Sequence, residues 1–124
     1  MANMCLRAMT LTAATASATG TDLENLSATA AHVIINITTL TGTAPTATFT
    51  VEAKDDSSGL YYTLLASTAI AATGTTVLKI GPSLTAAANS VVNDFVPKFF
   101  RVSMTAGGTI TNLTATVGVN LING

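Results

Sequence analysis

The chain has 124 residues, enough for one domain with its own core, and a single cysteine, Cys5, so no disulfide can form within it. Its net charge is −1, which gives no electrostatic reason to expect nucleic acid or an anionic membrane as a partner. Only 9% of the residues are charged, against about 25% in typical domains. Because so weakly charged a surface is poorly protected against association, we expect much of it to be covered in an assembly.

Residues 1–20 are rich in alanine and threonine and show no strong apolar periodicity. The sizeable apolar side chains of this segment include Leu6, Met9 and Leu11. We therefore predict an extended N-terminal arm with a short strand near residues 11–18, followed by a folded domain over residues 21–124. Such an arm could lie along a neighbouring subunit as an added strand, so these three side chains are predicted interface residues.

The segment HVIINITTL, residues 32–40, has the strongest β-strand pattern in the chain. Val33, Ile35 and Ile37 alternate with Ile34, and Leu40 follows further on, so both faces are apolar. A strand of this kind is central in a sheet or covered by a partner. Ile34 and Leu40 are therefore further predicted interface residues, and TGTAP is expected to break the strand.

Residues 49–65, FTVEAKDDSSGLYYTLL, predict a β-hairpin with an acidic tip. Asp55, Ser57 and Gly59 form a D-x-S-x-G pattern that faintly resembles a calcium loop, with Asp56 as a second charge. The further oxygen ligands of such a loop do not follow. Aspartate and serine favour turns because their side chains bond to nearby backbone groups, and we interpret the tip as a turn without a metal.

The remaining segments continue the β pattern. TTVLKI predicts a strand, residues 83–97 contain an Ala-rich half that could form a short helix, and KFFRVSMTA alternates cleanly. Gly107 and Gly108 predict a hairpin loop before a last strand over residues 110–122. The sequence thus predicts an all-β domain of six to eight mostly antiparallel strands, packed as a single β-sandwich.

No combination of residues supports catalysis. His32, the only histidine, adjoins an apolar strand without a serine or cysteine nucleophile in a recognisable motif. Glu52 and Asp94 are separated by about forty residues, and no glycine-rich phosphate loop is present. We therefore predict a protein that is not an enzyme and has no cofactor.

A family resemblance follows from the order of these segments. TFTVEAKDDSSGLYYTLL, GTTVLKIGP and NDFVPKFFRVSMTAGGTITNLTATVGVNLI resemble small structural proteins from the virion gene blocks of tailed bacteriophages. The resemblance implies a capsid decoration (cement) protein with a jelly-roll-like fold, often trimeric. Such a protein would sit on the capsid exterior and bridge neighbouring copies of the major capsid protein.

A second interpretation is a tail- or receptor-associated β-sandwich that binds a glycan or the host surface. The same strand order loosely resembles discoidin-like sugar-binding domains, which usually carry a tryptophan after the turn, where this chain has Tyr61 and Tyr62. The low charge and the N-terminal arm favour the structural virion protein.

Overall fold

The computed structural model describes residues 4–122 and contains no helix among them. Its strands are β1 (Met4–Ala14), β2 (Ala18–Thr19), β3 (Leu23–Glu24), β4 (Ala30–Lys54), β5 (Tyr61–Ala66), β6 (Gly74–Gly81), β7 (Val91–Asn93) and β8 (Phe99–Ile122). They form one open mixed sheet with the order β1-β8-β4-β6-β7. In addition β5 pairs with β4, while β2 and β3 pair with β8. Every pairing is antiparallel except that of β6 with β7, so the predicted all-β class is confirmed.

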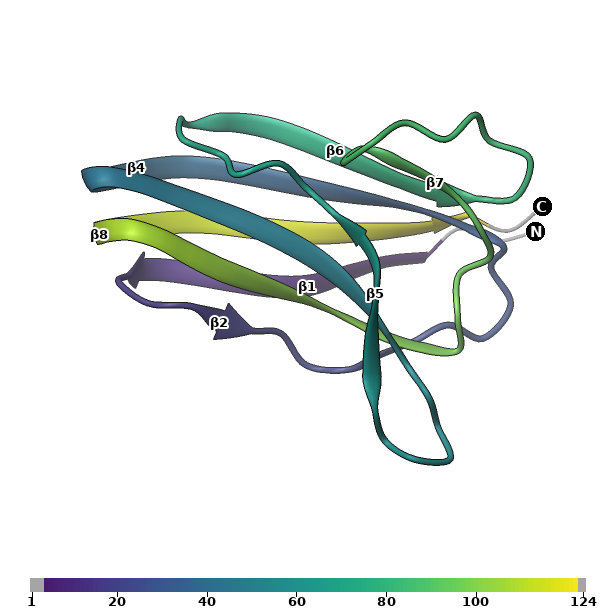
Figure 1. The fold of residues 1–124 in the computed structure, drawn as a ribbon. Coiled ribbons are helices and arrows are strands. Elements are labelled where there is room, and N and C mark those ends of the chain that lie inside the picture. The colour runs from purple at the N-terminus through teal and green to yellow at the C-terminus, as the bar shows by residue number, and fades with distance from the viewer. Residues whose placement is uncertain (1–3, 123–124) are drawn as a thin grey trace.

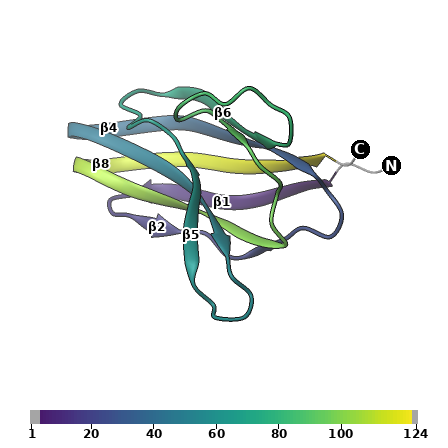
Figure 2. The same ribbon diagram turned by 45° about the vertical axis from the view of Figure 1, so that its right-hand side comes forward.

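The two longest strands, β4 and β8, pair along almost their whole length, from Ala30 opposite Ile122 to Ala53 opposite Phe100. Both strands turn back on themselves together at the left of Figure 1, and Figure 2 shows the same bends from another side. The register shifts at this bend, where Gly42 has a φ of 146° and Gly108 a φ of 64°. A side chain at Gly42 would place its Cβ 1.9 Å from the Thr109 carbonyl oxygen, so the bend requires glycine there.

The bend divides the sheet into two limbs. The β1 limb comprises β1, β6, β7, residues 30–41 of β4 and residues 110–122 of β8. The β5 limb comprises β2, β3, β5, residues 46–54 of β4 and residues 99–106 of β8. One continuous core holds the inward side chains of both limbs. Since no helix covers the sheet in the described part of the chain, the two limbs supply that core to each other (Figure 1).

The core confirms the alternation predicted for the strands. The largest fully buried side chains are Phe49, Phe100, Ile35, Leu78, Ile80, Met104, Leu113, Val33, Val51, Val102, Val117 and Val119. They come from β4, β6 and β8, and within each strand their neighbours in sequence point outward.

Four finer expectations are not met. The predicted jelly-roll sandwich of separate sheets is not confirmed, because the strands belong to one continuous sheet. The expected break at TGTAP and the hairpin loop at Gly107 and Gly108 are wrong: both segments lie inside long strands that bend together. The short helix expected within residues 83–97 is absent. That segment contains Ser83 and Asn89, whose φ values of 65° and 64° are incompatible with a right-handed helix.

The extended N-terminal arm is not confirmed either. Residues 4–14 form an edge strand that pairs with β8, from Met4 opposite Leu121 to Ala14 opposite Leu113. Farther along, the N–H of Gly20 donates to the Val102 carbonyl at 2.8 Å. Composition suggested an arm because the segment cannot bury much surface alone, but β8 offers it a complete strand of backbone partners and an apolar floor.

Candidate functional site: a charged and aromatic cluster on the β5 limb

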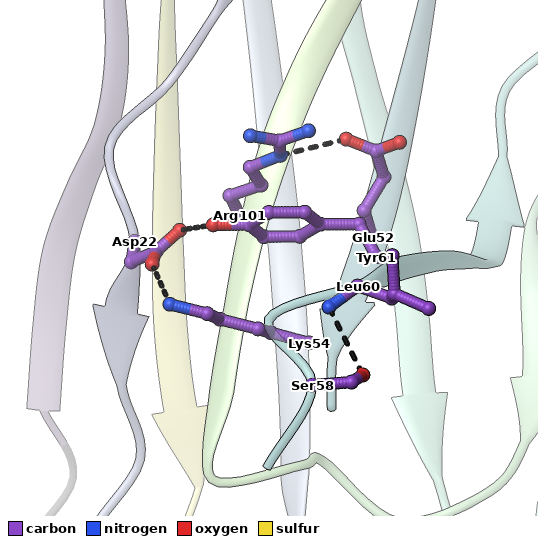
Figure 3. Close-up of polar contacts among 7 residues, drawn as sticks. All are labelled: Asp22, Glu52, Lys54, Ser58, Leu60, Tyr61 and Arg101. Carbon is purple, nitrogen blue, oxygen red and sulfur yellow. Dashed lines mark hydrogen bonds and ion pairs between the residues drawn. The ribbon is translucent and has the colours of Figure 1, made fainter. Parts of the chain in front are cut away.

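The outer face of the β5 limb carries a cluster of charged and aromatic side chains, hereafter the clamp, formed by Asp22, Glu52, Lys54, Tyr61 and Arg101 (Figure 3). Strand register brings four of them together: Glu52 lies opposite Arg101, and Lys54 lies opposite Tyr61. The fifth, Asp22, directly precedes β3. Residues from three distant parts of the sequence therefore meet on one surface.

Every charge in the clamp has an opposite partner. Arg101 donates from Nε to Glu52 at 2.8 Å, and its guanidinium carbon lies 3.5 Å from the centroid of the Tyr61 ring. The Tyr61 hydroxyl donates to one Asp22 oxygen at 2.6 Å, and Lys54 Nζ donates to the other at 3.0 Å. Figure 3 shows the Tyr61 ring between Arg101 and Lys54. The contacts tie the segment before β3 to β4, β5 and β8.

The clamp shifts three pKa values. The hydrogen bond from Tyr61, followed by that from Lys54, lowers the pKa of Asp22. The same hydrogen bonds to Asp22 raise the pKa of Tyr61 and the pKa of Lys54. Each shift stabilises the charge state that the ordinary pKa already gives near neutral pH. The groups are thus held further from proton exchange, whereas a general acid or base needs a pKa close to the working pH.

The acidic hairpin tip beside the clamp is a turn, as the sequence predicts. Asp55 Oδ2 accepts a hydrogen bond from the Ser58 hydroxyl at 2.7 Å, and its backbone N–H donates to the Leu60 carbonyl at 2.8 Å. The bond from Ser58, then that from the Ser57 backbone, lowers the pKa of Asp55. The carboxylate that would lead a calcium loop is therefore used to close the turn. No group of three or more potential metal ligands occurs within residues 4–122.

The other side chains considered for chemistry lie apart from one another. Glu52 pairs with Arg101, whereas Asp94 accepts a hydrogen bond from the backbone N–H of Phe95 at 2.7 Å in the loop after β7. His32 is half-exposed on the outer face of the β1 limb, and Cys5 is a free, exposed thiol on β1. Neither a carboxylate pair nor a nucleophile with its base is assembled from these residues.

The structure distributes the predicted interface residues over two environments. Met9 and Leu11 are buried in the core, 7% and 6% exposed, so they face this chain's own interior. Leu6 and Leu40 are partly buried and pack against that core. Ile34 alone among the five stands on an outer face, half-exposed between Gly118 and Val77 on the neighbouring strands.

A shallow groove of about 310 Å³ lies between β1 and the segment that follows it, lined by residues 7–11 and 18–21. Its lining contains no carboxylate and no histidine, and Arg7 is its one charged residue. The groove therefore offers backbone edges and small side chains but no pair of groups for acid–base chemistry.

Sequence reasoning missed the clamp. Its signal was present in the alternation of the two strands, where Glu52 and Arg101 both occupy outward positions, but their pairing depends on the register of strands almost fifty residues apart. None of the residues from 4 to 122 belongs to a helix that could span a membrane. Comparisons with protein-family models, with curated proteins and with solved structures found no match for this chain.

Proposed function

We propose that this protein is a structural protein of a tailed-phage virion that decorates and stabilises the outside of the capsid by bridging neighbouring major capsid proteins. The observation that carries the proposal is a set of exposed apolar side chains on loops. Leu26, Leu60 and Phe95 are 73%, 70% and 63% exposed, although the chain buries most of its other large apolar side chains. Exposed apolar groups of this kind mark contacts with other proteins.

The loops that carry Leu26 and Phe95 lie at the end of the molecule opposite the bend of β4 and β8, whereas the β4–β5 hairpin that carries Leu60 projects below the sheet (Figure 1). The first two loops are tied to each other: Asn25 is 8% exposed, and its side-chain amide donates to the Val96 carbonyl at 3.1 Å. Its oxygen accepts from the Ala28 N–H at 2.8 Å. A preorganised loop end loses little entropy when it binds, which suits a protein that must brace a shell.

The low charge content supports the same proposal, because a chain with 9% charged residues gains little from remaining free in solution. The partner in the proposal is the major capsid protein, the location is the capsid exterior, and the resemblance implies a homo-oligomer, commonly a trimer. No enzymatic step and no cofactor form part of the proposal.

Binding to empty capsid shells tests this function. Shells assembled from the major capsid protein of the same virus should retain the wild-type protein and gain thermal stability. The double variant Leu26→Ser with Phe95→Ser should bind at least tenfold more weakly, whereas Val77→Ser, on the outer face of the β1 limb, should bind as the wild type does. Retention on immobilised glycans but not on shells, or only a few copies per virion, would instead identify a receptor- or tail-associated module.

A further inference from the structure

The outer face of the β1 limb carries very little charge. Within residues 4–122, Arg7 on β1 and Lys79 on β6 are the only charged residues of this face, and all six acidic residues of the chain lie elsewhere. The acidic residues lie near β3, in the β5 limb, in the hairpin tip and in the loop after β7: Asp22, Glu24, Glu52, Asp55, Asp56 and Asp94. A face without carboxylates has no internal ion pairs and presents mostly neutral side chains.

Strand register arranges these side chains in three rows across β1, β8, β4 and β6, in that order. The first row is Cys5, Asn120, His32 and Lys79; the second is Arg7, Gly118, Ile34 and Val77; the third is Thr10, Thr116, Asn36 and Thr75. The residues of all three rows are half-exposed or exposed. The middle row therefore has an apolar centre between two more polar rows.

The centre of the middle row combines a hollow with a protrusion. Gly118 has no side chain, and a Cβ added there would find no atom closer than the Leu6 carbonyl oxygen at 3.9 Å, so the space above it is open. Directly beside it on β4 stands Ile34, and beyond that stands Val77, 39% exposed. A surface with a hole next to a knob of matching size can pack against a copy of itself.

We propose that this face is a contact between two copies of the chain, related by a twofold axis that runs parallel to the strands between β4 and β8. This axis places the strands of the second copy over those of the first in reverse order, with β6 over β1 and β4 over β8. Each row of one copy therefore faces the same row of the other copy. Ile34 of one copy then sits over Gly118 of the other, twice in each pair. The middle rows interdigitate at the centre, where two sheets packed face to face lie about 10 Å apart.

The same operation gives favourable neighbours in the other rows. Asn120 of one copy faces His32 of the other, and Thr116 faces Asn36, so each polar group meets a donor or an acceptor. Lys79 faces Cys5 and Arg7 faces Val77, so no cation lies directly opposite a cation. Both cations stand on the outer strands of the contact, β1 and β6, where their long side chains can reach water.

The size of the face predicts a weak pair. Four strands spaced about 4.8 Å apart and three rows spaced about 6.7 Å apart cover roughly 400 Å² per copy. Two copies together bury an area below the roughly 1,200 Å² of standard stable complexes. The pair should therefore be weak and should dissociate on dilution. Its formation should increase with salt, because salt screens the repulsion among the four cations.

Sedimentation equilibrium over a range of chain concentrations tests the proposal. The wild type should shift from the 12.5 kDa monomer to twice that mass as concentration rises. The variant Gly118→Val fills the hollow, its Cβ meets no atom closer than the Leu6 carbonyl oxygen at 3.9 Å, and valine suits a strand better than glycine. It should therefore fold normally and associate at least tenfold more weakly, while Thr63→Val on β5 should associate as the wild type does.

A double variant that exchanges the large and the small side chain tests whether Gly118→Val weakens association through packing at the contact. Combining Gly118→Val with Ile34→Ala moves the protrusion from one strand to the other and should restore part of the association that Gly118→Val removes. A wild-type chain that stays monomeric at millimolar concentration would overturn the proposal, as would a Gly118→Val variant that dimerises as well as the wild type. These outcomes are independent of binding to capsid shells, which involves the loops that carry Leu26 and Phe95.

Discussion

The outer faces of the two limbs are built on the same two strands yet differ sharply in chemistry. On the β5 limb, β4 and β8 contribute Glu52 opposite Arg101, within a cluster whose charges are all paired. On the β1 limb, the same strands contribute Ile34 opposite Gly118, in a face without acidic residues. The β5 limb needs its charges to hold the irregular segment around β3, whereas the regular strands of the β1 limb are held by their backbone pairing. A face that needs no clamp is available for contact with another molecule.

The largest expected effect concerns the edge of the β1 limb. Deleting residues 1–14 removes β1 and exposes the inward side chains of β8, including Val117, so the chain should fail to fold cooperatively. Circular dichroism and thermal melting report the loss. A deletion of residues 1–3 alone, which leaves β1 intact, is the control. Normal melting of the longer deletion would mean that the β1 limb is complete without β1.

A pair of neighbouring isoleucines compares the two sides of the same strand. Ile35 is fully buried while Ile34 is half-exposed. Ile35→Ala should lower the free energy of unfolding by about 2–5 kcal/mol, because it leaves a cavity. Ile34→Ala should lower it by less than about 1 kcal/mol in dilute protein. Urea denaturation measures both values, and equal losses would contradict the assignment of inner and outer faces.

The clamp on the β5 limb should contribute less than the core. A double-mutant cycle with Glu52→Gln and Arg101→Gln should give a coupling free energy of about 0.5–1 kcal/mol, because both side chains are partly exposed. The coupling should shrink at high salt. A matched cycle on Arg7 and Asn120, which form no ion pair, should give none. A coupling free energy of zero would mean that the ion pair between Glu52 and Arg101 does not stabilise the fold.

The smallest effect is a pH dependence. Because the pKa of Asp22 is lowered in the fold, its contribution to stability is complete above the unfolded value of about 3.9. The contribution is lost as the pH falls through the lowered folded pKa. The pKa values of Tyr61 and Lys54 are raised, so their contribution is present below about pH 10 and is lost as the pH rises through the raised values.

The melting temperatures of the wild type and Asp22→Asn, followed from acid to alkaline pH, measure this dependence. The difference in melting temperature between the two proteins should be largest between about pH 4 and about pH 10. It should become smaller at more acidic and at more alkaline pH. The Asp55 turn is present in both proteins and cancels in the comparison. A difference in melting temperature that stays constant with pH would show that the charge of Asp22 does not contribute to stability.

Local alternation was enough to predict which faces of β4 and β8 are buried. It placed Phe100, Val102 and Met104 inward, and it placed the β4–β5 hairpin with its turn at residues 55–59. These features depend on neighbours two residues apart, and a single sequence displays that spacing directly.

Features that depend on distant partners were not predictable in the same way. Glycines at positions 42 and 108 indicated ends of strands, but each strand bends and continues because the other strand, more than sixty residues away, bends beside it. For the same reason, the sequence predicted an arm where the structure has β1, and it did not predict the clamp. In each case the deciding partner lies on a strand whose register no local pattern specifies.

Chemical cross-linking tests most directly the claim that the two outer faces have different roles. A short reagent that joins a thiol to an amine, applied to a concentrated mixture of ¹⁴N- and ¹⁵N-labelled chains, starts at Cys5, the only thiol. The backbones of Cys5 and Lys79 of one chain are three strand spacings apart, about 14 Å, and only a product that joins the two isotopes counts as intermolecular. Mixed-isotope products should join Cys5 to Lys79, with none to Lys54 or Lys98. Products that join Cys5 chiefly to Lys54 or Lys98, or no intermolecular product at all, would contradict this claim.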